Sequence, residues 1–145
     1  MRPVVVVDAS VSVTWFIPRS PEEKYAEQAL ALLKAYADDR IELYQPPVWQ
    51  AEVLGVLSRV APGDAERHAW RLLSFDCASA SSSSVYLKAV QLSVQLGHHL
   101  FDTIYHAAAL SHSSAVLITA DKRYLGKAKT LGRILPLERW EEVFG

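Results

Sequence analysis

The sequence predicts an α/β fold, a three-layer α/β/α sandwich with a central parallel sheet, in a single domain over residues 1–145. Two apolar runs, residues 3–7 and 115–119, lack polar alternation, which is typical of strands buried on both faces. Helix-like stretches separate these runs from two shorter strand-like segments, residues 41–44 and 133–137. Strands that alternate with helices pair in parallel through crossover connections, so we expect helices on both faces of the sheet.

The first half of the chain alternates strand and helix signals. A short helical stretch follows the first strand, and a helix is expected over residues 20–39, where Ser20 can cap it and Pro21 suits its first position. Residues 46–60, which begin with two prolines, predict the next helix. Residues 64–75 predict another, so helical segments connect the strands throughout this half.

The second half begins with a low-complexity segment. Residues 78–84 are mostly serine, and we expect them to form a surface loop. Helices are expected over residues 85–96 and 101–111, separated at Gly97. A basic segment over residues 121–133, helix or loop, precedes the last strand.

Charge is unevenly distributed along the chain. The formal net charge of −1 gives no overall attraction to phosphate, which argues against a general nucleic-acid coat protein. Positive charge is nevertheless concentrated after Asp121, where the alternatives are a solvated face and a contact with a phosphate backbone. The candidate residues for such a phosphate contact are Lys122, Arg123, Lys127 and Lys129.

Cysteine content and the N-terminus bear on the compartment. The single Cys77 excludes an internal disulfide and is expected to be a small buried residue. The N-terminal apolar run is too short for a signal peptide or a membrane span. We therefore expect a cytoplasmic protein that does not associate with a membrane.

Four acidic residues are the candidate functional groups. Asp8 and Asp121 directly follow the apolar strands, and ligands bind beyond the carboxyl ends of parallel strands. Asp102 begins an apolar helix, and Glu52 lies on the largely apolar face of another, where Arg59 is a possible partner. Taken singly, each acid could be a helix cap or a paired surface group.

Taken together, these acids predict a metal site. Carboxylates at one sheet edge repel each other unless a cation neutralises them. Oxygen ligands without cysteine favour Mg²⁺ or Mn²⁺, which can activate water and stabilise charge on a phosphoryl group. The chemistry predicted is metal-dependent hydrolysis of phosphodiester bonds.

Four segments, in this order, resemble the motifs of the PIN-domain ribonucleases: "VVVVDASV", "PPVWQAEVLGVL", "LFDTIYHAAAL" and "LITADKRY". Over nearly its whole length the chain most resembles the VapC-type toxins of type II toxin–antitoxin pairs. The resemblance implies a metal-dependent endoribonuclease that cleaves RNA and is neutralised by a cognate antitoxin, as a homodimer or a hetero-oligomer. It implies a catalytic site that binds Mg²⁺ or Mn²⁺ through Asp8, Glu52, Asp102 and Asp121, with the hydroxyls of Ser10 and Thr119 beside them.

The sequence departs from this family at Gly55, where many relatives have Asn three residues after the glutamate. The departure puts a polar contact in doubt, not the acids. Two other functions remain open. A catalytically inactive PIN-like interaction module would use the acids only as caps, and an aspartyl-phosphate phosphatase would use Asp8 as its nucleophile, although Ser10 stands where such enzymes usually have a second acid.

We expect structural roles for the histidines and tryptophans. His98, Asp102 and His106 could share a metal-binding helix face, but Gly97 is expected to leave His98 outside the helix. His68 and His112 are expected at the surface or half-buried. Core or interface anchors are expected at Trp15, Trp49, Trp70 and Trp140.

Overall fold

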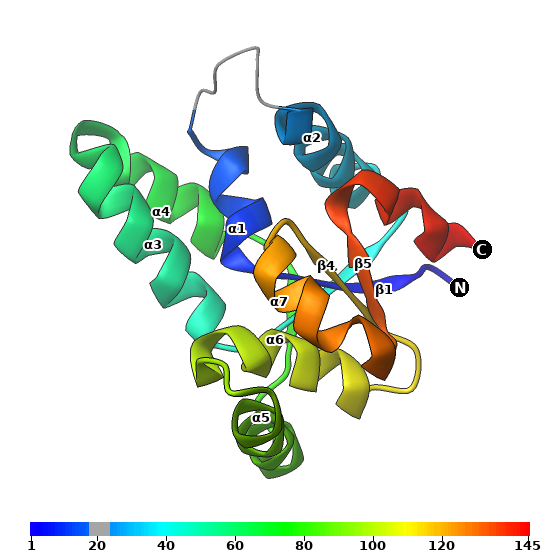
Figure 1. The fold of residues 1–145 in the computed structure, drawn as a ribbon. Helices are drawn as coiled ribbons and strands as arrows, with labels where there is room; N and C mark the ends of the chain where they lie inside the picture. Colours follow the sequence, from blue (N-terminus) through cyan, green and yellow to red (C-terminus); the bar gives the residue numbers. More distant parts are fainter. Residues whose placement is uncertain (18–23) are drawn as a thin grey trace.

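A five-stranded parallel sheet forms the centre of the computed structural model, which describes residues 1–17 and 24–145 (Figure 1). The strand order is β3-β2-β1-β4-β5. The strands are β1 (Val4–Val7), β2 (Glu42–Gln45), β3 (Cys77–Ser79), β4 (Val116–Thr119) and β5 (Ile134–Pro136). The predicted parallel sheet is confirmed.

The valine run forms the middle strand of this sheet. β1 pairs with β2 on one side, where Val5 lies opposite Leu43, and with β4 on the other, where Val7 lies opposite Ile118. Val5 and Val7 have no exposed surface, as expected for a strand covered on both faces. The register brings the ends of β1 and β4 to the same edge of the sheet.

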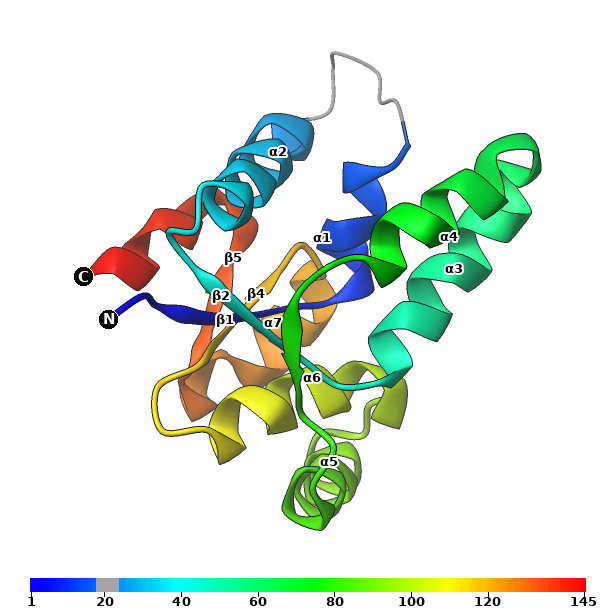
Figure 2. The same cartoon turned by 180° about the vertical axis from the view of Figure 1, so that it is seen from behind.

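Helices cover both faces of the sheet. Figures 1 and 2 show α2 and the C-terminal 3₁₀ segment on one side and α5 with α6 on the other, which confirms the three-layer sandwich. The helices are α1 (Ala9–Ser12), α2 (Lys24–Ala37), α3 (Val48–Val60), α4 (Ala65–Leu73), α5 (Ser83–Leu96), α6 (Leu100–Ser111) and α7 (Lys122–Ala128). The 3₁₀ segments are Val13–Trp15, Pro62–Asp64, Lys129–Leu131 and Leu137–Phe144. Within the part of the chain that the structure describes, every helix is too short or too polar to cross a membrane.

Two expectations about helix starts have different outcomes. The expected cap Ser20 and the expected first-turn Pro21 lie outside the described residues, and α2 is seen from Lys24. α3 begins at Val48 rather than at the first of the two prolines, with Pro47 in the flanking position. Both helices keep the crossover roles expected of them.

The serine-rich segment is not a loop throughout, and the prediction for residues 78–84 was wrong. Its first two residues belong to β3, which pairs with β2 so that Tyr44 lies opposite Ala78. Ser82 is the N-cap of α5, whose first residue is Ser83. Serine favours helix starts because its side chain competes for backbone hydrogen bonds, so the run marks a helix boundary.

Several aromatic and polar side chains occupy places the sequence did not assign. Trp70 is 73% exposed on α4, so of its two expected roles only that of an interface anchor stays open, whereas the other three tryptophans are buried in the core. His68 is buried beside Phe16, contrary to expectation, while His112 is half-buried as expected. Cys77 is half-buried on the edge strand β3 rather than fully enclosed.

Candidate active site

Asp8 lies at the carboxyl end of β1, where its side chain accepts two hydroxyl hydrogen bonds. Ser10 donates to one carboxylate oxygen, and Thr119, the last residue of β4, donates to the other. Asp8 is the N-cap residue of α1, but its carboxylate makes no capping hydrogen bond there. The residue therefore directs its carboxylate toward the neighbouring strand end and not into its own helix.

Asp121 is linked to Asp8 by hydrogen bonds of the same threonine, Thr119. The backbone N–H of Asp121 donates to Thr119 Oγ1 over 3.0 Å, so one hydroxyl connects the two acids. Asp121 Oδ1 also accepts the backbone N–H of Tyr124 over 3.0 Å and caps α7. The capping alternative thus holds for one oxygen of Asp121, and the other makes no bond to its own helix start.

Asp102 approaches this edge from the first turn of α6. Its Oδ2 atom lies 2.8 Å from Nε2 of His98, whose side chain is only 6% exposed. Asp102 does not cap α6, because His99 is the N-cap residue. One possible ligand atom each of His98, Asp102 and Asp121 lies within 4.8 Å of the others, the one such cluster among the described residues.

Glu52 reaches the site from α3. Its Oε1 atom accepts a hydrogen bond from the hydroxyl of Tyr105, a buried residue of α6. Arg59, the partner considered from sequence, lies exposed two turns further along α3. The tyrosine, which no sequence signal singled out, is the group that orients this glutamate.

Burial and mutual repulsion act on these carboxyl groups. Desolvation, with smaller contributions from the charges of Asp121 and Asp102, raises the pKa of Asp8 to about 6, although the two hydroxyl bonds oppose it. Burial and the charge of Asp102 also raise the pKa of Glu52. Burial, followed by the bond to Glu52, raises the pKa of Tyr105, which keeps its hydroxyl protonated as a donor. Asp102 therefore acts on acids from both α3 and β1.

The donor set fits a hard divalent cation. Asp102 and Asp121 offer carboxylate oxygens within 4.8 Å of each other, and such oxygens are the ligands that Mg²⁺ and Mn²⁺ prefer. Asp8 and Glu52 lie outside that cluster, near enough for the charge of Asp102 to raise their pKa values. A nearby cation would oppose the desolvation and repulsion that raise the pKa of Asp8. The residues present are thus suited to hold one.

A cavity of about 540 Å³ opens beside these acids, with Asp102 and Asp121 in its wall. Arg123 lines the same cavity and provides a cation next to the carboxylates. Phosphate groups could therefore meet Arg123 at the point where the acids lie.

The other basic residues of the segment differ in what they contact. Lys127 Nζ lies 3.2 Å from His98 Nδ1, and Lys122 Nζ lies 4.0 Å from a carboxylate oxygen of Glu138. Lys129 is exposed. Arg133 donates to the backbone carbonyls of residues 109, 112, 113 and 115, so it holds the α6–β4 connection together.

The two histidines around Asp102 have separate environments. His106 is buried, and its ring nitrogens contact the Tyr124 hydroxyl and the Gly132 carbonyl, each at 2.8 Å. His106 therefore does not share a metal-binding face with Asp102. His98 precedes α6 as expected, but the left-handed Gly97 (φ 58°) turns the chain so that the imidazole contacts Asp102.

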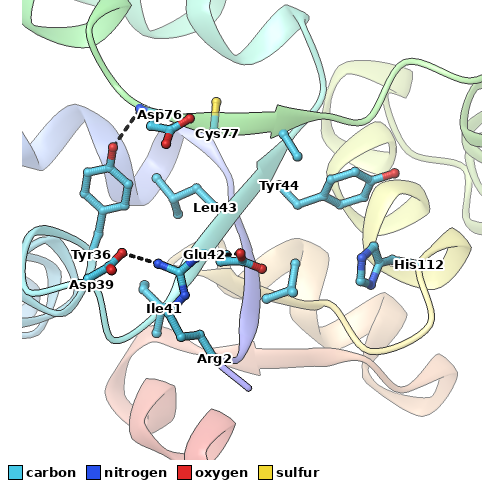
Figure 3. Close-up of a pocket in the computed structure, with 12 residues that line it drawn as sticks. Arg2, Tyr36, Asp39, Ile41, Glu42, Leu43, Tyr44, Asp76, Cys77 and His112 are labelled. Carbon is cyan, nitrogen blue, oxygen red and sulfur yellow. Dashed lines mark hydrogen bonds and ion pairs between the residues drawn. The ribbon is translucent and has the colours of Figure 1, made fainter.

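A second cavity, of about 360 Å³, lies beside β2 and β3 and is lined by none of the four acids (Figure 3). Arg2 pairs there with Asp39 and with Glu42, the latter at 2.7 Å. The hydroxyl of Tyr36 accepts the backbone N–H of Asp76 over 2.7 Å. Because Arg2 in this second cavity is already paired with two carboxylates, we place the candidate active site at the cavity lined by Asp102 and Asp121.

Comparison with known proteins adds to this geometry. The sequence model of the PIN domain matches residues 5–130. The chain belongs to the PIN-domain family. This PIN domain also resembles a solved structure described as a toxin–antitoxin complex from Klebsiella pneumoniae, with a TM-score of 0.67 and 17% sequence identity over 93% of this chain and 97% of that chain. No curated protein sequence matches it. At that identity the structural likeness concerns the fold.

Proposed function

We propose that this PIN domain is an endoribonuclease that requires Mg²⁺ or Mn²⁺ and cleaves RNA phosphodiester bonds. The observation that carries the proposal is the group of carboxylates at one sheet edge, where burial and like charges raise the pKa of Asp8 to about 6. Family membership and the cavity lined by Arg123 support it. Buried carboxylates that repel each other lower the stability of the fold, and a bound cation would offset this loss.

The acids would hold the ion, and their neighbours would orient them. In this proposal Asp8, Glu52, Asp102 and Asp121 are the metal ligands and catalytic residues. When bound, the ion supplies activation of water and stabilisation of the charge that develops on the phosphoryl group. The hydroxyls of Ser10 and Thr119 fix both oxygens of Asp8, and Tyr105 fixes one oxygen of Glu52.

RNA would approach through the basic segment. Arg123 lines the cavity with two of the acids, and Lys122 and Lys129 are exposed on the same part of the chain. We assign these three side chains to contacts with the phosphate backbone, which carry no sequence information by themselves. Lys127 is a further candidate for this role, and its ammonium also contacts His98.

A cleavage assay tests the activity. Purified protein is mixed with a structured RNA in Mn²⁺, in EDTA, and in Mn²⁺ with Asp8→Asn in place of the unmodified protein. Cleavage should occur only in the first sample, and Glu141→Gln, which alters an exposed acid far along the chain, should cleave normally. Equal products in all samples would indicate a contaminant, and no cleavage in any sample would favour an interaction module.

We further propose that the chain is the toxin of a toxin–antitoxin pair in the cytoplasm. The supporting observation is the fold shared with a structure described as a toxin–antitoxin complex. The expected partner is an antitoxin encoded by a neighbouring gene, and the expected assembly is a homodimer or a hetero-oligomer with it. Co-expression with the neighbouring gene product should abolish RNA cleavage and increase the mass measured by light scattering. A neighbour that changes neither would contradict this assignment.

A further inference from the structure

His98 lies between a carboxylate of the candidate metal site and a lysine outside it. Its Nε2 atom is 2.8 Å from Asp102 Oδ2, and its Nδ1 atom is 3.2 Å from Lys127 Nζ. Lys127 Nζ also donates to the carbonyl of Gly97 over 3.2 Å. The ring packs edge-on against Tyr124 with centroids 5.0 Å apart. The imidazole is thus held on three sides.

The partners of His98 determine which ring nitrogen carries the proton. A lysine ammonium has three donors and no acceptor, so Nδ1 must accept the bond from Lys127. The proton of the neutral ring is then on Nε2, which donates it to the carboxylate of Asp102. The three groups form one directed chain of hydrogen bonds from Lys127 through His98 to Asp102.

These hydrogen bonds distinguish two roles for His98. A direct metal ligand needs a free nitrogen lone pair, and the cluster of His98, Asp102 and Asp121 could suggest one. The lone pair on Nδ1 faces Lys127, however, and Nε2 is a donor. The contacts therefore favour an imidazole that acts on a ligand over one that is itself a ligand.

We propose that His98 and Lys127 are positioning residues that hold Asp102 Oδ2 and leave Oδ1 of Asp102 for the divalent cation. The inference rests on the proposed metal site. Hydrogen-bond partners of ligating carboxylates fix their orientation, and their loss typically weakens metal binding about 10-fold to 100-fold. Lys127 acts here through His98, whereas Arg123 faces the cavity itself.

Calorimetric titration of the metal-free protein with Mn²⁺ tests the role of His98. His98→Phe keeps the ring that packs on Tyr124 but removes the donor, and it should weaken binding about 10-fold or more. His98→Gln keeps an amide donor that can reach the position of Nε2, and it should recover part of the affinity. Glu141→Gln changes an exposed acid that does not line this cavity and should bind Mn²⁺ as the unmodified protein does.

Nuclear magnetic resonance of the imidazole nitrogens at pH 8, in metal-free protein, tests the hydrogen bonds from Lys127 through His98 to Asp102. The signals absent from His98→Gln belong to His98, and they should show the proton on Nε2. Lys127→Met should shift the Nδ1 resonance of His98. Lys129→Met, which removes a similar charge that is not hydrogen-bonded to His98, should leave it unchanged. A proton on Nδ1 would overturn the inference.

The calorimetric outcomes separate this inference from the proposed function. If the unmodified protein binds Mn²⁺ and His98→Phe binds it equally well, the positioning role of His98 is wrong and the metal site stands. If the unmodified protein does not bind Mn²⁺, the proposed function and this inference both fail. Weaker binding by His98→Phe with partial recovery by His98→Gln would support the positioning role.

Discussion

Replacing Asp8 by Asn should stabilise the metal-free protein at pH 8. The pKa of Asp8 is about 6 in the folded protein and 3.8 for an unperturbed group, so ionised Asp8 costs about 3 kcal/mol of folding free energy. Asparagine removes this cost, but its amide cannot accept both hydroxyl bonds from Ser10 and Thr119, which loses about 1 kcal/mol. The net gain is about 1 to 2 kcal/mol, or about 3 to 6 °C in Tm.

The stability gained by Asp8→Asn should depend on pH, which gives a second test of its cause. Because the folded-state pKa of Asp8 is raised, the stability it contributes is present below pH 3.8 and is lost as the pH rises through about 6. Asp8→Asn should therefore differ little from the unmodified protein near pH 4 and be more stable above pH 7. Thermal unfolding followed by circular dichroism in EDTA, with Glu141→Gln as the control, measures both points. An equal Tm at pH 8, or the same gap at pH 4 and pH 8, would refute the reasoning.

Three further substitutions test other parts of the site and its surroundings. Tyr105→Phe removes the donor to Glu52, so the pKa of Glu52 should rise further and the free energy of unfolding at pH 7 should fall by about 1 to 2 kcal/mol in urea titrations; no loss would mean that the bond is not formed. Gly55→Ala lies mid-helix with nothing within 4 Å of the added Cβ, so it should raise that free energy by about 0.5 to 1 kcal/mol and leave RNA cleavage unchanged; destabilisation would contradict the open space. Arg123→Ala should weaken RNA binding in filter assays and reduce its salt dependence by about one phosphate contact; an unchanged slope would remove Arg123 from the interface.

The sequence predicts the parts of this fold that depend on local pattern. Uninterrupted apolar runs identify β1 and β4, because both faces of these strands are covered. The acids that follow them, Asp8 and Asp121, reach the same edge because parallel strands share a direction. The edge strand β3 is different, since its pairing with β2 gives it an extended backbone that its short sequence, Cys-Ala-Ser, does not favour.

The neighbours of the acids could not be predicted in the same way. Tyr105 is one of many apolar or aromatic residues on a buried helix, and its contact with Glu52 joins positions 53 residues apart. His98 was expected outside the helix, and it is, but its contact with Asp102 depends on the turn at Gly97. Lys127 belongs to a basic run in sequence and is distinguished from its neighbours by its contacts with the His98 imidazole and the Gly97 carbonyl. Such contacts are set by tertiary packing, which periodicity does not encode.

A single titration joins metal binding to catalysis and tests the central claim most directly. The rate at which metal-free protein cleaves one RNA is measured as Mn²⁺ is added, and the half-saturating concentration is compared with the Kd for Mn²⁺ determined by calorimetry under the same conditions. The carboxylate site predicts that the two values agree, that EDTA reverses the activity, and that Asp8→Asn remains inactive at every concentration. Cleavage at full rate in EDTA, or by Asp8→Asn, would contradict it.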